Sequence, residues 1–226
     1  MNLSDNMPLS LIIVGNTSNA RLAKFYFERD TTFKVVAFAV DAAYIKEESF
    51  EGKPVVALEN LRENYPPQQY SIFVAIGYSQ MNQLRAQKYL QCKAWGYGFA
   101  SYISPRCHFL SQFPCGENCF ILEDNTIQPY AKIGNNVVLW SGNHIGHDTR
   151  IDDHCFITSH VVVAGFTHIE AYCFIGVNAT LRDDITIGEK SLIGAGAVVV
   201  QNTAPESVIV PPASIQLKRK SSEVKI

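Results

Sequence analysis

The sequence has no apolar stretch near the roughly 20 residues that a membrane-spanning helix needs. Its formal net charge is only −2, so it lacks the basic surplus of a typical nucleic-acid-binding domain. The first ten residues, MNLSDNMPLS, lack a basic segment followed by a long apolar core, which predicts no signal peptide. These absences argue against membrane and nucleic-acid functions, and we expect a cytoplasmic protein.

A six-residue repeat dominates the second half of the chain. A helix repeats about every 3.6 residues and a strand every second residue, so a period of six predicts a solenoid with three flat sides and about 18 residues per coil. We expect the aliphatic side chain of each unit to point inward and stack on its equivalents. These side chains are Ile121, Ile127, Ile133, Leu139, Ile145, Ile151, Ile157, Val163, Ile169, Ile175, Leu181, Ile187, Ile193 and Val199.

Two further columns follow the same register. Two residues before each aliphatic stands a small or medium-sized side chain, with Ile185 as the exception, and this column includes Cys119, Cys155 and Cys173. We interpret these cysteines as buried apolar residues in a reducing compartment, not as disulfide partners. Glycine often follows the aliphatic, and we expect these glycines to adopt unusual backbone angles at turns. They are Gly134, Gly146, Gly176, Gly188 and Gly194.

Residues 9–104 follow a different pattern, in which apolar runs alternate with amphipathic ones. This alternation predicts a small parallel α/β sheet that binds ligands at the carboxyl ends of its strands. The expected strands cover 9–15, 33–41 and 70–77, and the expected helices cover 19–29 and 79–91.

The two patterns divide the chain. We expect an α/β domain over residues 1–106, a solenoid over 107–204 and a tail over 205–226. A hinge is expected at Ile103-Ser104-Pro105, between the first two parts.

This layout resembles the bacterial nucleotide-sugar N-acyltransferases of the bacillosamine and perosamine acetyltransferase type, which are related to sialic-acid O-acetyltransferases. The first strand ends at a glycine, the second at an acidic residue, and the third at Ala-Ile-Gly followed by Asn and Arg. The first loop here has one glycine where the family has several, and Val210-Pro211-Pro212-Ala213 lacks the family's glycine before Pro-Ala. The matching residues are Gly15, Asp41, Ala75, Ile76, Gly77, Asn82 and Arg85.

The resemblance implies a Rossmann-like nucleotide-sugar-binding domain followed by a left-handed parallel β-helix. It implies a homotrimer that transfers an acetyl group from acetyl-CoA to a nucleotide-linked amino sugar for surface-glycan biosynthesis, without a metal ion. The acetyl-CoA is expected in grooves between neighbouring subunits, beside Gly165, Val177 and Ala195. The sugar nucleotide is expected beside Gly15, Asn16, Asp41, Gly77, Tyr78 and His144.

His147 occupies the register of the family's catalytic histidine, two residues after Ile145, and Asp148 follows it. Imidazole can accept a proton near neutral pH, as an amine must lose one when it attacks a thioester. An adjacent carboxylate can orient the ring and stabilise its charged form. A backbone N–H at Gly165, 18 residues on, would stabilise the oxyanion. His154 and His168 are expected on the surface.

Three alternatives remain at this stage. The same histidine would deprotonate a hydroxyl in an O-acetyltransferase that acts on a sugar or sialic acid. A zinc enzyme of the γ-carbonic-anhydrase type needs two histidines five residues apart, whereas the solenoid histidines are separated by 3, 6, 7, 8 and 10. The third alternative is a scaffold that has lost its chemistry.

Overall fold

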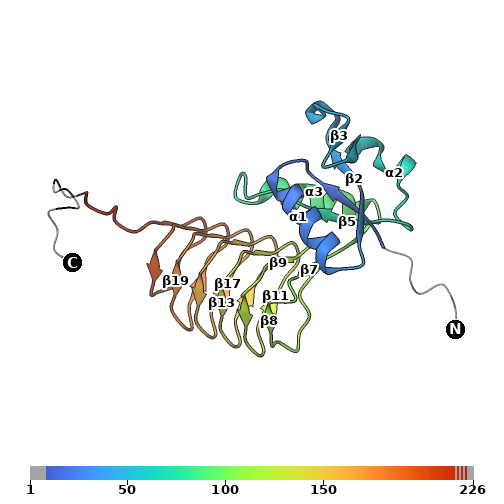
Figure 1. Ribbon diagram of the computed structural model, residues 1–226. Helices are drawn as coiled ribbons and strands as arrows, with labels where there is room; N and C mark the ends of the chain where they lie inside the picture. Colours follow the sequence, from blue (N-terminus) through green and yellow to red (C-terminus); the bar gives the residue numbers. More distant parts are fainter. Residues whose placement is uncertain (1–8, 217, 219, 221, 223–226) are drawn as a thin grey trace.

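The computed structural model describes residues 9–216, 218, 220 and 222. Residues 1–8, on which the signal-peptide prediction mainly rests, lie outside the described residues. So do positions 217, 219, 221 and 223–226 of the tail. Figure 1 shows an α/β part packed on one end of a long solenoid. Within the described residues, no helix is both long and apolar enough to cross a membrane.

The α/β part is built on a sheet with strand order β3-β4-β2-β1-β5-β6. Its strands run parallel except for the short hairpin of β3 and β4. The buried residues of β1 alternate between two clusters, with Ile13 on one side of the sheet and Ile12 on the other. The strands are β1 Ser10–Val14, β2 Lys34–Val40, β3 Ser49–Phe50, β4 Lys53–Ala57, β5 Ser71–Val74 and β6 Gly98–Phe99.

Two helices were predicted, and the one expected over 19–29 is present. The one expected over 79–91 begins only at Gln83, because Gln80, Met81 and Asn82 all have positive φ angles that a helix cannot include. A short helix between them was not predicted. The helices are α1 Ser18–Asp30, α2 Leu61–Asn64 and α3 Gln83–Ala94, with short 3₁₀ turns at Ala42–Tyr44 and Leu58–Asn60.

The solenoid has three faces, each a stack of parallel two-residue strands. The face that packs against the α/β part is here called the docking face. It contains β7 Tyr102–Ile103, β9 Phe120–Ile121, β12 Val138–Leu139, β15 Phe156–Ile157, β18 Phe174–Ile175, β21 Leu192–Ile193 and β23 Val208–Ile209. The second face contains β8 His108–Phe109, β10 Thr126–Ile127, β13 His144–Ile145, β16 Val162–Val163, β19 Thr180–Leu181 and β22 Val198–Val199. The third face contains β11 Lys132–Ile133, β14 Arg150–Ile151, β17 His168–Ile169 and β20 Thr186–Ile187.

The predicted inward ladder forms the core of this solenoid. Each of the fourteen aliphatic side chains is at most 6% exposed. Cys119, Cys155 and Cys173 are fully buried beside them, and all six cysteines carry free thiols. The prediction that these three cysteines pack as apolar core residues is therefore confirmed.

The glycines after the aliphatics have a different role from the expected one. Positive φ angles occur two positions further on, at residues such as Asn136, Asp148 and Phe166. A Cβ added to Gly176 would lie 2.5 Å from the backbone nitrogen of Ala195, one coil further along. These glycines are needed because successive coils approach closely, and the expectation of unusual backbone angles there was wrong.

Replacing Gly176 by alanine is therefore expected to destabilise the solenoid by about 1–3 kcal/mol, since backbone on both coils must move. Gly98 is the matched control, because a Cβ there meets no atom within 4 Å. Chemical denaturation of both variants checks this, and equal unfolding midpoints for the two would contradict it.

The segment expected as a hinge is the first rung of the docking face. Tyr102 and Ile103 pair with Phe120 and Ile121 of β9, and Tyr102 is fully buried. Ser104 is 2% exposed, and its N–H donates to the carbonyl of Ile121. The ladder therefore runs from β7 to β23, and it extends beyond 107–204 at both ends.

Candidate functional site

His147 lies at the corner between the second and third faces, here called the His147 corner. Its ring Nδ1 is 3.0 Å from Asp148 Oδ2, and its backbone N–H donates to Gln128 Oε1 at 2.9 Å. Adjacent side chains on a strand point to opposite sides, but Asp148 has a φ of 56°, which turns its carboxylate back toward the ring. The side chain of His147 is 51% exposed, so the ring is open to a substrate.

Gly165 lies one coil beyond His147 and leaves room for its ring. A Cβ on Gly165 would come within 2.9 Å of both Cε1 and Nε2 of His147. Phe166 packs edge-on against the same ring, with centroids 4.9 Å apart. Among the backbone hydrogen bonds of the described chain, the Gly165 N–H donates to no acceptor.

The predicted residues of the α/β part meet at one edge of its sheet. Gly15 and Asn16 follow β1, Asp41 follows β2, and Gly77 and Tyr78 follow β5, all at carboxyl ends of parallel strands. Strand order reverses between β1 and β5, which opens the crevice where α/β sheets bind ligands.

Individual contacts define this edge further. Gly15 has a φ of 122°, and a Cβ there would lie 3.2 Å from the Ala75 carbonyl oxygen, so glycine is required. The Asp41 carboxylate forms an ion pair with Lys88 of α3. Thr17 begins α1 without a side-chain cap, which leaves N–H groups of the first turn free for a ligand.

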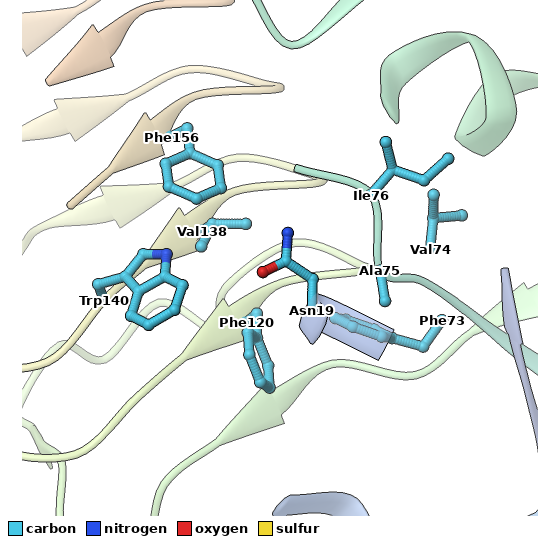
Figure 2. A pocket seen from close by; sticks show the side chains of 9 residues that line it. All are labelled: Asn19, Phe73, Val74, Ala75, Ile76, Phe120, Val138, Trp140 and Phe156. Carbon is cyan, nitrogen blue, oxygen red and sulfur yellow. The ribbon is translucent and has the colours of Figure 1, made fainter. Parts of the chain in front are cut away.

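A small cavity lies where this edge meets the docking face (Figure 2). Asn19 of α1 points toward Trp140 of the solenoid, between Phe120 and Phe156. The volume of about 20 Å³ holds roughly one water molecule. Tyr78 is 56% exposed and packs on Phe156 and Phe174, with ring centroids 5.1 and 4.8 Å away.

Asn82 and Arg85, which belong to the family motif, bind the solenoid. Both are fully buried. Asn82 Nδ2 donates to the carbonyls of Tyr172 and Cys173 at 3.1 and 3.2 Å. Arg85 donates from Nη1 to the Asn136 carbonyl and from Nη2 to the carbonyls of His154 and Cys155. The first turn of α3 therefore contacts three successive coils, and burial lowers the Arg85 pKa to about 10.

These carbonyls belong to the corner between the third and docking faces, here called the asparagine corner (Asn118, Asn136, His154 and Tyr172). Asn118 Oδ1 accepts from the Val74 N–H at the end of β5, and Asn118 Nδ2 donates to Asn136 Oδ1. Asn136 Nδ2 in turn donates to His154 Nδ1 at 2.9 Å. Sequence reasoning missed this ladder, although its four members recur every 18 residues.

His154 was expected on the surface, but its side chain is buried between Tyr89 and Tyr172. Burial, with a smaller contribution from nearby Arg85, lowers the His154 pKa to about 4. His168 is half-buried, and its Nε2 is 2.8 Å from Asp152 Oδ2. The surface prediction was wrong for His154, because the α/β part covers its corner.

The buried imidazole predicts an acid-sensitive junction. The folded pKa lies below the ordinary value of about 6.5, so the unfolded chain binds an extra proton between these values. Stability is complete above about pH 6.5 and is lost as the pH falls toward 4, by up to about 3 kcal/mol. His154→Gln keeps an amide in reach of Asn136 and is expected to flatten this dependence in denaturation curves recorded from pH 4 to 8. An unchanged slope would contradict the assignment.

Val177 and Ala195 lie at the third corner, between the docking and second faces, here called the Val177 corner. Both are exposed, and they stack one coil apart. His144 lies on β13 of the second face, between Thr126 and Val162 of the adjacent strands. Within one chain, the structure does not bring Val177 or Ala195 to His147, because the second face separates the two corners.

Comparison with known proteins shows what the repeats of the solenoid resemble. Residues 130–165 and 166–201 match the bacterial transferase hexapeptide family model of six repeats. A curated acyl-[acyl-carrier-protein]–UDP-N-acetylglucosamine O-acyltransferase of Nautilia profundicola is 29% identical over 100 residues, which are 41% of this chain and 39% of that protein. The chain thus spans about two fifths of the length of this relative. These two segments of the solenoid are therefore similar to the hexapeptide repeats of bacterial transferases.

Solved structures match nearly the whole chain. The acetyltransferase domain of PglB from Neisseria gonorrhoeae has a TM-score of 0.77 and 25% identity, with 88% of this chain and 94% of that one covered. PerB from Caulobacter crescentus, in complex with CoA and GDP-perosamine, has a TM-score of 0.76 and 25% identity over 88% and 92%. WeeI from Acinetobacter baumannii shares the fold, with a TM-score of 0.75 and 19% identity over 89% and 96%.

These matches confirm the resemblance seen in the sequence. The strands and repeats fit a left-handed β-helix, and the structural neighbours include an acetyltransferase domain and a protein solved with CoA and GDP-perosamine.

Proposed function

We propose that this protein transfers an acetyl group from acetyl-CoA to the amino group of a nucleotide-linked amino sugar. The observation that carries the proposal is the exposed His147–Asp148 pair, with Gly165 leaving space beside the ring. Its support from relatives is the similarity to PerB, whose structure holds CoA and GDP-perosamine, and to the PglB domain, which has been solved with acetyl-CoA.

The chemistry assigns a step to each group. Asp148 accepts a hydrogen bond from Nδ1, so Nε2 of His147 is the atom that takes the amine proton. The sugar nitrogen forms a bond to the thioester carbonyl carbon, and the carbon–sulfur bond breaks when the resulting intermediate collapses. The CoA thiolate leaves and takes up a proton. The free N–H of Gly165 stabilises the oxyanion of that intermediate.

The arrangement of the faces favours a site shared between subunits. The α/β part covers the docking face, where Phe120, Val138 and Phe156 are at most 7% exposed. In a three-sided coil, the His147 corner lies opposite that face, on the order of 15 Å away for sides of six residues. A sugar nucleotide held by the α/β part therefore reaches the His147 of a neighbouring copy.

A homotrimer in which the second faces of the three copies pack together would form such a shared site. That face carries exposed valines, with Val162 41% and Val198 67% exposed, which a neighbouring copy would cover. It is flanked by the His147 corner on one edge and the Val177 corner on the other. Packing in a ring would place Val177 and Ala195 of one copy beside His147 and Gly165 of the next, with acetyl-CoA in the groove between them.

The remaining assignments follow from this proposal. Residues 1–106 act as a Rossmann-like nucleotide-sugar-binding domain through Gly15, Asn16, Asp41, Gly77 and Tyr78, and residues 107–204 act as the acyltransferase domain. Residues 205–226 are assigned as a tail. His144 lies near enough to its own corner to line the sugar pocket. The enzyme would act in the cytoplasm, where acetyl-CoA and nucleotide sugars are made, before the glycan is exported.

Product analysis tests the proposal directly. The full chain is incubated with acetyl-CoA and UDP-, GDP- or dTDP-linked amino sugars, while thiol release and product mass are followed. An amide that resists mild alkali is expected. Release of CoA with none of these amines, or an alkali-labile ester as product, would contradict it.

An O-acyltransferase is the second candidate. It is favoured by two curated relatives that match about two fifths of the chain, which are named as acyl-[acyl-carrier-protein]–UDP-N-acetylglucosamine O-acyltransferases. The base chemistry at His147 would be the same, with a hydroxyl in place of the amine. Calorimetry with an amino-sugar nucleotide and with its hydroxyl analogue distinguishes the two candidates.

Gly165→Ala is expected to lower turnover by about 10- to 100-fold while leaving stability nearly unchanged. The new methyl group would displace the His147 ring but meets no other atom closer than the ring within the solenoid. Turnover numbers and unfolding midpoints, measured against Gly98→Ala, check this. Full activity of Gly165→Ala would mean that the ring position is not critical.

A further inference from the structure

A recess of about 330 Å³ adjoins the His147 corner on the side of the third face. Its lining includes Asp148 and Thr149, which follow His147 in the chain. The other lining residues are Phe113, Tyr130, Lys132 and Arg150. Tyr130 is 56% exposed and Phe113 is 38% exposed, so two aromatic surfaces open into the same space.

The two cations of this recess lie side by side on adjacent strands. Lys132 and Arg150 are register partners on β11 and β14, adjacent parallel strands about 4.8 Å apart. Like charges placed directly opposite one another destabilise a sheet unless an anion compensates them.

The partners of these cations leave donors free. Arg150 uses Nε for Asp152, at 2.6 Å, and its side chain is 63% exposed. Lys132 lies over the Phe113 ring, 4.9 Å from its centroid, and has no carboxylate partner among the described residues. The Lys132 ammonium and the outer nitrogens of Arg150 can therefore donate to an anion that enters the recess.

We propose that this recess binds the diphosphate of a nucleotide co-substrate whose reacting end lies at His147. Lys132 contributes a compact charge, and Arg150 contributes paired N–H groups that suit phosphate oxygens. Tyr130 supplies a face on which the nucleotide can stack. The Asp148 carboxylate, which also lines the recess, contacts His147 Nδ1, and its negative charge would keep the phosphates on the side of Lys132 and Arg150.

The proposal rests on the proposed acetyl transfer for the identity of its ligands. Acetyl-CoA and a nucleotide sugar both carry a diphosphate, so two sources share this chemistry. Binding is measured first, by calorimetry on the full chain with CoA, UDP, GDP and dTDP as probes, because this readout does not require turnover. Failure of the proposed function would appear as absent amide product, independently of these affinities.

Lys132→Gln and Arg150→Gln are expected to weaken binding of at least one probe by about 10- to 100-fold. Lys190→Gln is the matched control, because Lys190 also lies over an aromatic ring, that of Tyr172, but at the asparagine corner. Its affinities should stay within about twofold of the unmodified chain.

Kinetics then distinguish the two sources. If the recess holds the donor diphosphate, Lys132→Gln raises the KM for acetyl-CoA but not for acetyl-pantetheine, which lacks phosphates. If it holds the acceptor diphosphate, the KM for the sugar nucleotide rises instead. The proposal is overturned if no probe binds the unmodified chain, or if Lys132→Gln binds every probe as tightly as Lys190→Gln. The Lys132 variant decides alone should Arg150→Gln fail to fold.

Discussion

Replacing His147 by alanine is expected to lower kcat for acetyl transfer by about 100- to 10,000-fold, the usual contribution of a general base. The ring is half-exposed, and among the described aromatic side chains it packs on Phe166 alone, so the fold should tolerate the change. Because the proton transfer proposed for Nε2 takes place in the transition state, KM for the sugar nucleotide should change little. Steady-state kinetics with varied acetyl-CoA and varied acceptor measure both quantities.

His108→Ala is the control for this variant. His108 is an exposed histidine on β8, at the first coil of the second face, and it has no contact with His147. The turnover of the His108→Ala variant is expected to lie within about twofold of that of the unmodified chain. Near-normal turnover of His147→Ala would remove His147 as the base and would favour a scaffold or a different catalytic corner.

Replacing Arg85 by alanine is expected to destabilise the protein by about 3–5 kcal/mol, because a fully buried cation donates to three solenoid carbonyls, each of which would lose that hydrogen bond. No carboxylate forms an ion pair with Arg85 among the described residues; backbone oxygens and the Phe156 ring, 5.6 Å away, compensate the charge. Thermal and chemical denaturation measure the loss, and limited proteolysis reports whether the α/β part separates from the solenoid.

Arg106→Ala is the matched control for Arg85. Its guanidinium is 68% exposed and pairs with Asp124 at 2.8 Å. Exposed pairs of this kind contribute at most about 1 kcal/mol, so the variant should unfold close to the unmodified chain. An equal loss of stability for the two substitutions would show that Arg85 of α3 does not hold the α/β part on the solenoid.

The sequence was most informative where geometry is repetitive. A fixed step of six residues predicted the inward ladder, the buried cysteines and the corner of His147, since each coil inherits the register of the previous one. Contacts between coils were harder to predict. Gly176 is required by the backbone of Ala195, a neighbour 19 residues away that no local pattern reveals.

The candidate site was predictable in part for the same reason. The position of His147 follows from the ladder, but its pairing with Asp148 depends on a positive φ angle that periodicity does not encode. The sequence showed Arg85 only as part of the family motif and predicted no contact for it, whereas its side chain turns toward the solenoid. Long-range packing determined both outcomes.

The hydrogen bonds from Asn82 and Arg85 to the solenoid limit how the solenoid can change in length. Six added residues turn every later residue by one third of a revolution, whereas 18 restore its angle but move it about 4.8 Å along the axis. Between Asn136 and Cys173, either change would separate the backbone oxygens bound by Asn82 and Arg85. Whole coils can therefore be added after Ala195 without moving these backbone oxygens, or His147, relative to α3.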